Sequence, residues 1–114
     1  MRRDEAYLLD MLIAARDAVS CLGSLTRQEF QNSRLHQLAV LKAVETVGEA
    51  AARVSEATRA LYPDIPWREI VGMRHHLVHG YFEVDLEIVW STVRNDLPPL
   101  AARLERIVPP EGGS

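Results

Sequence analysis

The sequence predicts an all-α protein, an antiparallel bundle of four to five helices with short connections. Apolar residues recur at helical spacing in several segments, and glycine and proline are clustered between those segments. No segment alternates apolar and polar residues in the way that a half-buried β-strand does. The chain has 114 residues, of which 47% are hydrophobic and 25% charged, proportions typical of a globular domain. We therefore expect residues 1–108 to form one domain and 109–114 to be a flexible tail.

The first helix is predicted from about Asp4 to Leu22, because apolar residues lie on one face throughout that range. Gly23 is placed to end it, since glycine accepts the left-handed conformation that often follows a helix. Thr26 and Glu29 have the spacing of a capping box. They predict a short helical turn through about residue 31.

A long second helix is predicted from about Ser33 to Val54 or beyond. The residues expected on its apolar stripe are Leu38, Leu41, Val44 or Glu45, Gly48 and Ala51. Gly48 and the alanines at 50–52 are small enough to let another helix approach closely.

The segment from Ala60 to Pro66 contains two prolines, so we expect an irregular connector or a brief turn there. Pro66 suits the first position of a third helix, because its missing N–H is not needed there. The apolar pattern continues past this point, and Gly80 is the residue expected to end the third helix.

Asp85 is placed to cap a fourth helix that runs from Leu86 to about Asn95. Prolines 98 and 99 follow Asp96 and mark the restart of a final helix, which is expected to continue to about Val108.

The composition excludes several classes of protein. Cys21 is the single cysteine, so no internal disulfide and no zinc cluster built on cysteines can form. Charged residues interrupt the apolar N-terminal segment, which is therefore neither a signal peptide nor a membrane span. We expect a cytoplasmic protein without a membrane partner. The net charge of −3 gives no long-range attraction to nucleic acid, so RNA binding would need a local basic site.

Titratable residues are concentrated in MRHHLVHGYFEVD, residues 73–85. His75 and His79 would share one face of a continuous helix and could bind a metal with carboxylates such as Glu45 and Glu49. That interpretation is weak, because no acidic residue lies between the histidines and Arg74 adds a positive charge. Each histidine can also be read simply as a surface or core-rim residue.

Arg74 and His79 are five residues apart, about 140° on a continuous helix, so they would not share a face. They can converge if the helix ends near His79, as Gly80 indicates, or if a second subunit supplies the facing wall of a shared cleft.

Arg74, His79 and Tyr81 form an R-x4-H-x-Y pattern. Three further segments support the same comparison: AVETVGEAA in the second helix, DIPWREIVGM before the pattern, and DLEIVWSTVRNDLPPL after it. Together they resemble the HepT-like group of the HEPN superfamily, also known as DUF86. The resemblance covers almost the whole chain.

This resemblance implies a HEPN-type helical bundle that acts as a homodimer, with the motifs of both subunits lining one cleft. It implies an RNA endonuclease that needs no metal or other cofactor. Arg74 and His79 correspond to the family's catalytic residues. His75 takes a position that is often asparagine, and it joins Glu49 as a candidate supporting residue.

The resemblance also implies a partner. Members of the group are usually toxins paired with a minimal nucleotidyltransferase antitoxin, which transfers AMP to the motif tyrosine, here Tyr81. A tyrosine at this position could equally pack against Phe82 and Trp90. Two functions stay open: a ribonuclease toxin, or a noncatalytic HEPN module that binds nucleotide, nucleic acid or a nucleotidyltransferase.

Overall fold

The computed structural model describes residues 2–73, 75, 78–79 and 83–108. In chain order the elements are α1 (Arg2–Leu22), α2 (Arg27–Gln31), α3 (Arg34–Arg53), α4 (Glu56–Leu61), α5 (Trp67–Val71), strands β1 (Val78–His79) and β2 (Glu83–Val84), α7 (Leu86–Ser91), the π-helix η1 (Thr92–Asp96) and α8 (Leu97–Ile107). The predicted all-α class is confirmed, with one two-residue β ribbon added. The predicted tail lies outside the described residues, so the domain limit at residue 108 stays a prediction.

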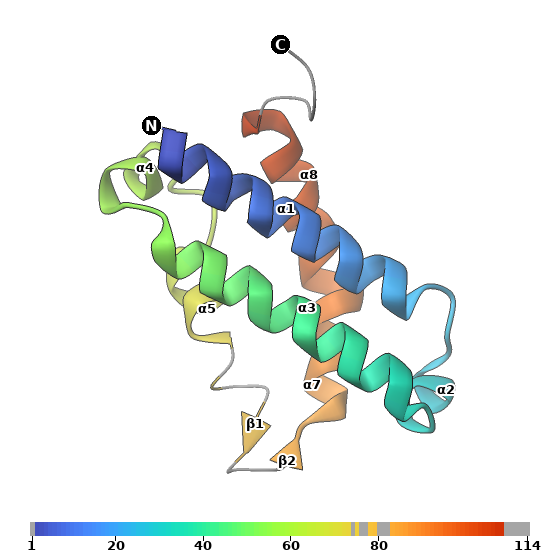
Figure 1. Ribbon diagram of the computed structural model, residues 1–114. Coiled ribbons are helices and arrows are strands. Elements are labelled where there is room, and N and C mark those ends of the chain that lie inside the picture. The colour runs from blue at the N-terminus through green and yellow to red at the C-terminus, as the bar shows by residue number, and fades with distance from the viewer. Residues whose placement is uncertain (1, 74, 76–77, 80–82, 109–114) are drawn as a thin grey trace.

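The core lies between α1, α3 and α8. Helices α1 and α3 run side by side in opposite directions, and α8 crosses behind them (Figure 1). Met11 of α1, Val47 of α3 and Leu104 of α8 are completely buried, as is Phe30 of α2. Each helix presents its apolar face to this centre, which is where burial of apolar surface stabilises the bundle.

The predicted helix ends of the N-terminal half are confirmed. Gly23 follows α1 with φ of 54°, in the left-handed region. The capping box is present: Thr26 Oγ1 accepts from the Glu29 N–H at 3.1 Å, and Glu29 Oε1 accepts from the Thr26 N–H at 2.8 Å. Ser33 caps α3, so its predicted start is confirmed, and the helix ends at Arg53 without continuing beyond Val54.

Asp4 connects the start of α1 to the start of α4. Its carboxylate accepts hydrogen bonds from the Ser55 backbone N–H (3.1 Å) and from the hydroxyls of Ser55 and Thr58 (both 2.5 Å). The Ser55 hydroxyl, followed by that of Thr58, holds the pKa of Asp4 below its usual value of 3.8. Helix α4 was not predicted, and this carboxylate is one of the contacts that fix it.

The third helix was predicted wrongly. Pro66 is its N-cap rather than its first residue, and α5 ends at Val71, well before Gly80. Residues 78–79 form β1 instead, which pairs antiparallel with β2 through Val78↔Val84 and His79↔Glu83. The sequence from Gly72 onward has helical periodicity, but pairing with a segment further along the chain prevails over it.

The C-terminal helices form one continuous rod. Helix α7 passes into η1, and η1 passes directly into α8. Pro98 and Pro99 lie in the first turn of α8, as expected for a restart. In a continuous α-helix each proline would leave one carbonyl without its hydrogen bond, and its ring would clash with the carbonyl four residues earlier. The wider π turn over Thr92–Asp96 moves those carbonyls away from the prolines, so the helix continues without interruption. No helix in the described part of the chain is long and apolar enough to span a membrane.

Candidate functional site

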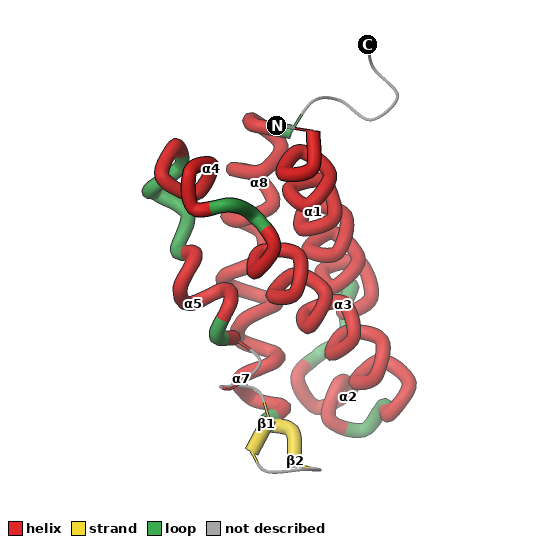
Figure 2. Tube along the Cα trace, turned by 60° about the vertical axis from the view of Figure 1, so that its left-hand side comes forward, coloured by secondary structure: helices red, strands yellow, loops and turns green. Residues whose placement is uncertain are grey.

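The β ribbon, whose first strand contains His79, lies at one end of the molecule (Figure 2). His79 is in β1, and His75 is an exposed residue in the helical turn after α5, where its N–H donates to the Gly72 carbonyl at 3.0 Å. Glu49 is exposed on α3. Arg74 and Tyr81 lie outside the described residues.

The chain enters this region from α5, which is fixed to the rest of the fold. Trp67 and Ile70 are buried, and the indole N–H of Trp67 donates to the Tyr62 carbonyl at 3.0 Å. Gly48 of α3 lies against the same helix, because a Cβ added there would be 3.2 Å from the carbonyl oxygen of Ile70. Gly48, the small residue predicted to allow close helix packing, therefore sets the distance between α3 and α5. The contact is at Ile70, which is four positions before Arg74 in the sequence.

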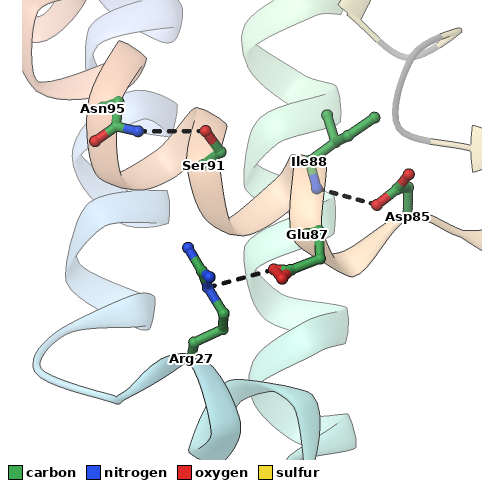
Figure 3. A network of polar contacts seen from close by, with 6 residues as sticks. All are labelled: Arg27, Asp85, Glu87, Ile88, Ser91 and Asn95. Atoms are coloured by element: carbon green, nitrogen blue, oxygen red, sulfur yellow. Dashed lines mark hydrogen bonds and ion pairs between the residues drawn. The ribbon is translucent and has the colours of Figure 1, made fainter.

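The chain leaves the β ribbon through α7, which is held against α2. Asp85 caps α7 as predicted, accepting from the Ile88 N–H at 3.1 Å, and Arg27 of α2 pairs with Glu87 at 3.3 Å (Figure 3). The Trp90 ring packs against Phe30 with 6.0 Å between centroids.

Arg94 strengthens the same anchor. Its guanidinium lies 4.5 Å from the centroid of the Trp90 ring. It also donates to the carbonyl oxygens of Gly23 (3.0 Å) and Leu25 (2.9 Å). Arg94 thus joins the connection after α1 to the C-terminal rod. The segment from Gly72 to Asp85 is held between α5 and α7, and functional loops are commonly held by packed helices in this way.

The helical interpretation of the histidines was wrong. His75 follows α5 in a helical turn, whereas His79 is in β1, so the two do not share a helix face. Within the described residues, no group of three or more histidine, cysteine, aspartate or glutamate residues is arranged to bind a metal ion. His79 lies in β1, beyond the end of α5, and Arg74 is outside the described residues, so their convergence stays a prediction.

Within the described residues, two hollows are lined by α5, α7 or their neighbours. The first, of about 520 Å³, lies between α5 and the C-terminal rod and includes Glu69, Met73, Ile88, Asn95 and Leu100 in its wall. The second, of about 440 Å³, lies between α3 and the segment from β2 to α7. We call it the α3–α7 groove, and its lining residues are Arg34, Gln37, Leu38, Leu41, Val84, Leu86 and Val89.

Leu38 was predicted to be in the core, and this prediction is wrong. The side chain is 51% exposed, and Leu35 on the preceding turn is 75% exposed, whereas Val40, Ala43, Val44 and Val47 form the buried stripe. The sequence analysis did not single out Leu35. Its spacing could have done so, because Leu35 and Leu38 share a helix face with Lys42 and Glu49 rather than with the buried residues.

Comparison with known proteins identifies the family. The family described as Ribonuclease HepT-like matches residues 11–107. The chain belongs to this HepT-like family of the HEPN superfamily.

Relatives match over nearly their full length. A protein of Methanocaldococcus jannaschii named "Putative RNase" is 34% identical over 105 residues, covering 91% of this chain and 96% of that protein. A protein of Thermococcus cleftensis named "Probable ribonuclease HepT" is 35% identical over 110 residues, covering 93% and 96%. No solved structure gives a significant match.

Proposed function

We propose that this protein is a metal-independent RNA endonuclease, the toxin of a pair whose antitoxin is a minimal nucleotidyltransferase. The main support is the family match over residues 11–107 together with an intact Arg74, His79, Tyr81 pattern. Relatives named as ribonucleases align over more than nine-tenths of this chain, so the proposed activity concerns the whole domain.

RNA contains its own nucleophile, which suits a site without metal. The ribose 2′-oxygen attacks the adjacent phosphorus, the bond to the 5′-oxygen breaks, and the products are a 2′,3′-cyclic phosphate and a 5′-hydroxyl. His79 is proposed to move the protons, because imidazole titrates near neutrality. Arg74 is proposed to stabilise the phosphate, since guanidinium stays charged and its fork matches two phosphate oxygens.

The roles of base and acid require two proton-transfer groups, and a homodimer supplies them as two copies of His79. His75 and Glu49 are proposed as supporting residues. Both are exposed, so their side chains are accessible to a substrate.

Regulation is proposed to act on Tyr81. Its phenolic oxygen would attack the α-phosphorus of ATP, with pyrophosphate leaving and the phenolic proton passing to a base. Each AMP added would bring bulk and negative charge beside a phosphate-binding site, and both oppose RNA binding.

A cleavage assay tests the activity directly. Purified wild type and Arg74→Ala are incubated with total RNA and with transfer RNA, with and without a metal chelator, and the products are resolved on a gel. We expect cleavage by the wild type in both buffers and a loss of about a hundredfold or more in the variant. A wild type that leaves both RNAs intact at high enzyme concentration would instead indicate a noncatalytic HEPN module.

Mass spectrometry tests the regulation. After incubation with the cognate nucleotidyltransferase and ATP, peptides containing Tyr81 should gain AMP, and Tyr81→Phe should remain unmodified and active. Adducts at other residues alone would refute the assignment.

A further inference from the structure

The hollow between α5 and the C-terminal rod has the size of a small-molecule site. Its volume is about 520 Å³, and we call it the α5–rod hollow. Sites for small ligands occupy roughly 300–1,000 Å³ and are lined mainly by apolar side chains with a few polar groups among them. Much of this wall is apolar, since Ile70 and Leu100 are buried and Met73 is partly buried. The body of a small apolar ligand would fit against these three side chains.

The π-helix η1 contributes the polar part of the wall. Three of its residues, Thr92, Asn95 and Asp96, line the hollow. Single π turns within helices occur frequently at functional sites. Asp96 precedes α8 as its N-cap, but its side chain makes no capping hydrogen bond. The start of α8 therefore does not require this carboxylate.

Thr92 supplies a buried hydroxyl that lacks a partner. The residue is 7% exposed, and its hydroxyl makes no hydrogen bond to any residue that the structure describes. Every fully buried side-chain nitrogen or oxygen atom in the described residues has a partner, so the Thr92 oxygen must keep some accessible surface. Because Thr92 lines the α5–rod hollow, a ligand there could reach this oxygen.

The charge of the wall selects the sign of the ligand. Glu69 of α5 and Asp96 of η1 are exposed carboxylates, and neither has an ion-pair partner among the described residues. Arg103, a cation of the same wall, is occupied by Asp64: it donates to the Asp64 carbonyl oxygen and lies 3.6 Å from the carboxylate. The wall therefore attracts a positive charge and repels a phosphate.

The remaining polar groups are suited to an ammonium group. Asn95 Nδ2 donates to the Ser91 hydroxyl at 3.2 Å (Figure 3), which leaves the Asn95 side-chain oxygen as an acceptor. The Thr92 hydroxyl can accept as well, and an ammonium group has three N–H donors. A bare metal ion is a poorer match, because the described residues contain no group of three or more metal ligands.

We propose that the α5–rod hollow binds a small organic amine. Its apolar part lies against Ile70, Met73 and Leu100, and its ammonium group is held by Glu69 and Asp96. The proposal does not depend on RNA cleavage, and its test contains no RNA.

Titration with phenethylamine, followed by NMR of the backbone amides, tests the site. We expect the signals of Ile70, Thr92 and Leu100 to shift with a dissociation constant on the order of 1 mM, as suits so small a ligand. Two compounds of similar shape serve as probes of charge: 2-phenylethanol is neutral and 3-phenylpropionate is negative. Both should bind about tenfold more weakly or worse, since neither can donate from a charged group.

Substitutions locate the ammonium group. Glu69→Gln and Asp96→Asn keep the side-chain shape and should each raise the dissociation constant for phenethylamine by about fivefold. Thr92→Val, which loses only the hydroxyl, should raise it by a similar factor of about five. Glu56→Gln is the matched control, because Glu56 is exposed on α4 and does not line the hollow. It should bind as the wild type does, and unchanged amide signals away from the hollow should show that all variants are folded.

A tripeptide Leu-Lys-Leu with blocked ends distinguishes a free amine from a lysine of a partner protein, which has the same chemistry. Weaker binding of the tripeptide than of phenethylamine supports the proposal, and binding that is as tight or tighter overturns it. The proposal also fails if the three phenyl compounds bind equally, if Glu69→Gln binds like Glu56→Gln, or if no amide of the hollow shifts at about 10 mM phenethylamine.

Discussion

The packed core and the segment between Gly72 and Asp85 are built in different ways. The core joins α1, α3 and α8 through fully buried side chains such as Met11 and Leu104, spread over most of the chain. The segment that carries the motif contributes one short β ribbon and depends on its two supports, α5 and α7. We therefore expect stability and activity to respond to different substitutions: those in the core should unfold the protein, and those in the segment should lower activity in a protein that stays folded.

The largest effect on stability is expected from the core. Phe30→Ala removes a side chain with no exposed surface that also supports Trp90. It should lower the free energy of unfolding by about 3–5 kcal/mol, measured by urea denaturation. Leu35→Ala, on the exposed face of α3, is the control and should change it by no more than about 0.5 kcal/mol. A similar loss in both variants would show that the core is not where we place it.

Gly48→Ala tests the link between the core and the segment. The added methyl would meet the Ile70 carbonyl oxygen at 3.2 Å and push α5 away from α3. We expect a loss of stability of about 1–2 kcal/mol and a fall in RNA cleavage per folded molecule.

Ala52→Gly is the control for this variant. Ala52 is an exposed residue on α3, and the change should cost about 1 kcal/mol of stability through helix propensity alone. Its cleavage rate should match the wild type. Equal cleavage by the Gly48 variant would show that the α3–α5 spacing does not position the motif.

Asp4→Asn should lower the stability of the fold by an amount that depends on pH, because it weakens the contact between the starts of α1 and α4. Because the pKa of Asp4 is lower in the folded state than in the unfolded state, its charged form stabilises the fold fully above about pH 3.8, and this contribution is lost as the pH falls through the lower folded value. The difference in melting temperature between wild type and variant should therefore be largest near neutrality and narrow in acid. Asp10→Asn, at an exposed position on the same helix, is the matched control for the substitution.

The smallest effect on stability is expected at Asp85, the N-cap of α7. Asp85→Ala removes the cap of α7 and should cost about 1 kcal/mol, whereas Asp85→Asn keeps an accepting oxygen and should cost less. Thermal unfolding of the two variants measures the difference. If alanine and asparagine are equally tolerated, the cap does not hold this end of the segment.

Helix ends and caps were predicted correctly where they depend on residues that are neighbours in the sequence. Gly23, the Thr26–Glu29 capping box and Asp85 were all predicted from a few neighbouring residues, and each forms as expected. The β ribbon was missed because its pairing joins residues 78–79 with 83–84, while helical periodicity continued through the same positions. Helix α4 was missed because part of what fixes it is Asp4, about fifty residues away.

The candidate site was predicted only in part for the same reason. The motif could be read from the sequence, and the structure places His79 in β1, beyond the end of α5, whereas Arg74 and Tyr81 lie outside the described residues. A pattern of apolar residues does not fix which of them meet the core, so Leu38 was assigned to the apolar stripe although it is 51% exposed.

If His79 moves the protons as proposed, RNA cleavage depends on the segment between Gly72 and Asp85, and the stability of the fold does not. Wild type and His79→Ala from parallel preparations should be compared for the rate of RNA cleavage and for melting temperature. We expect the rate to fall by about a hundredfold or more while the melting temperature stays within about 2 °C. Cleavage by His79→Ala at the wild-type rate, or a loss of activity that follows from unfolding, would contradict the account.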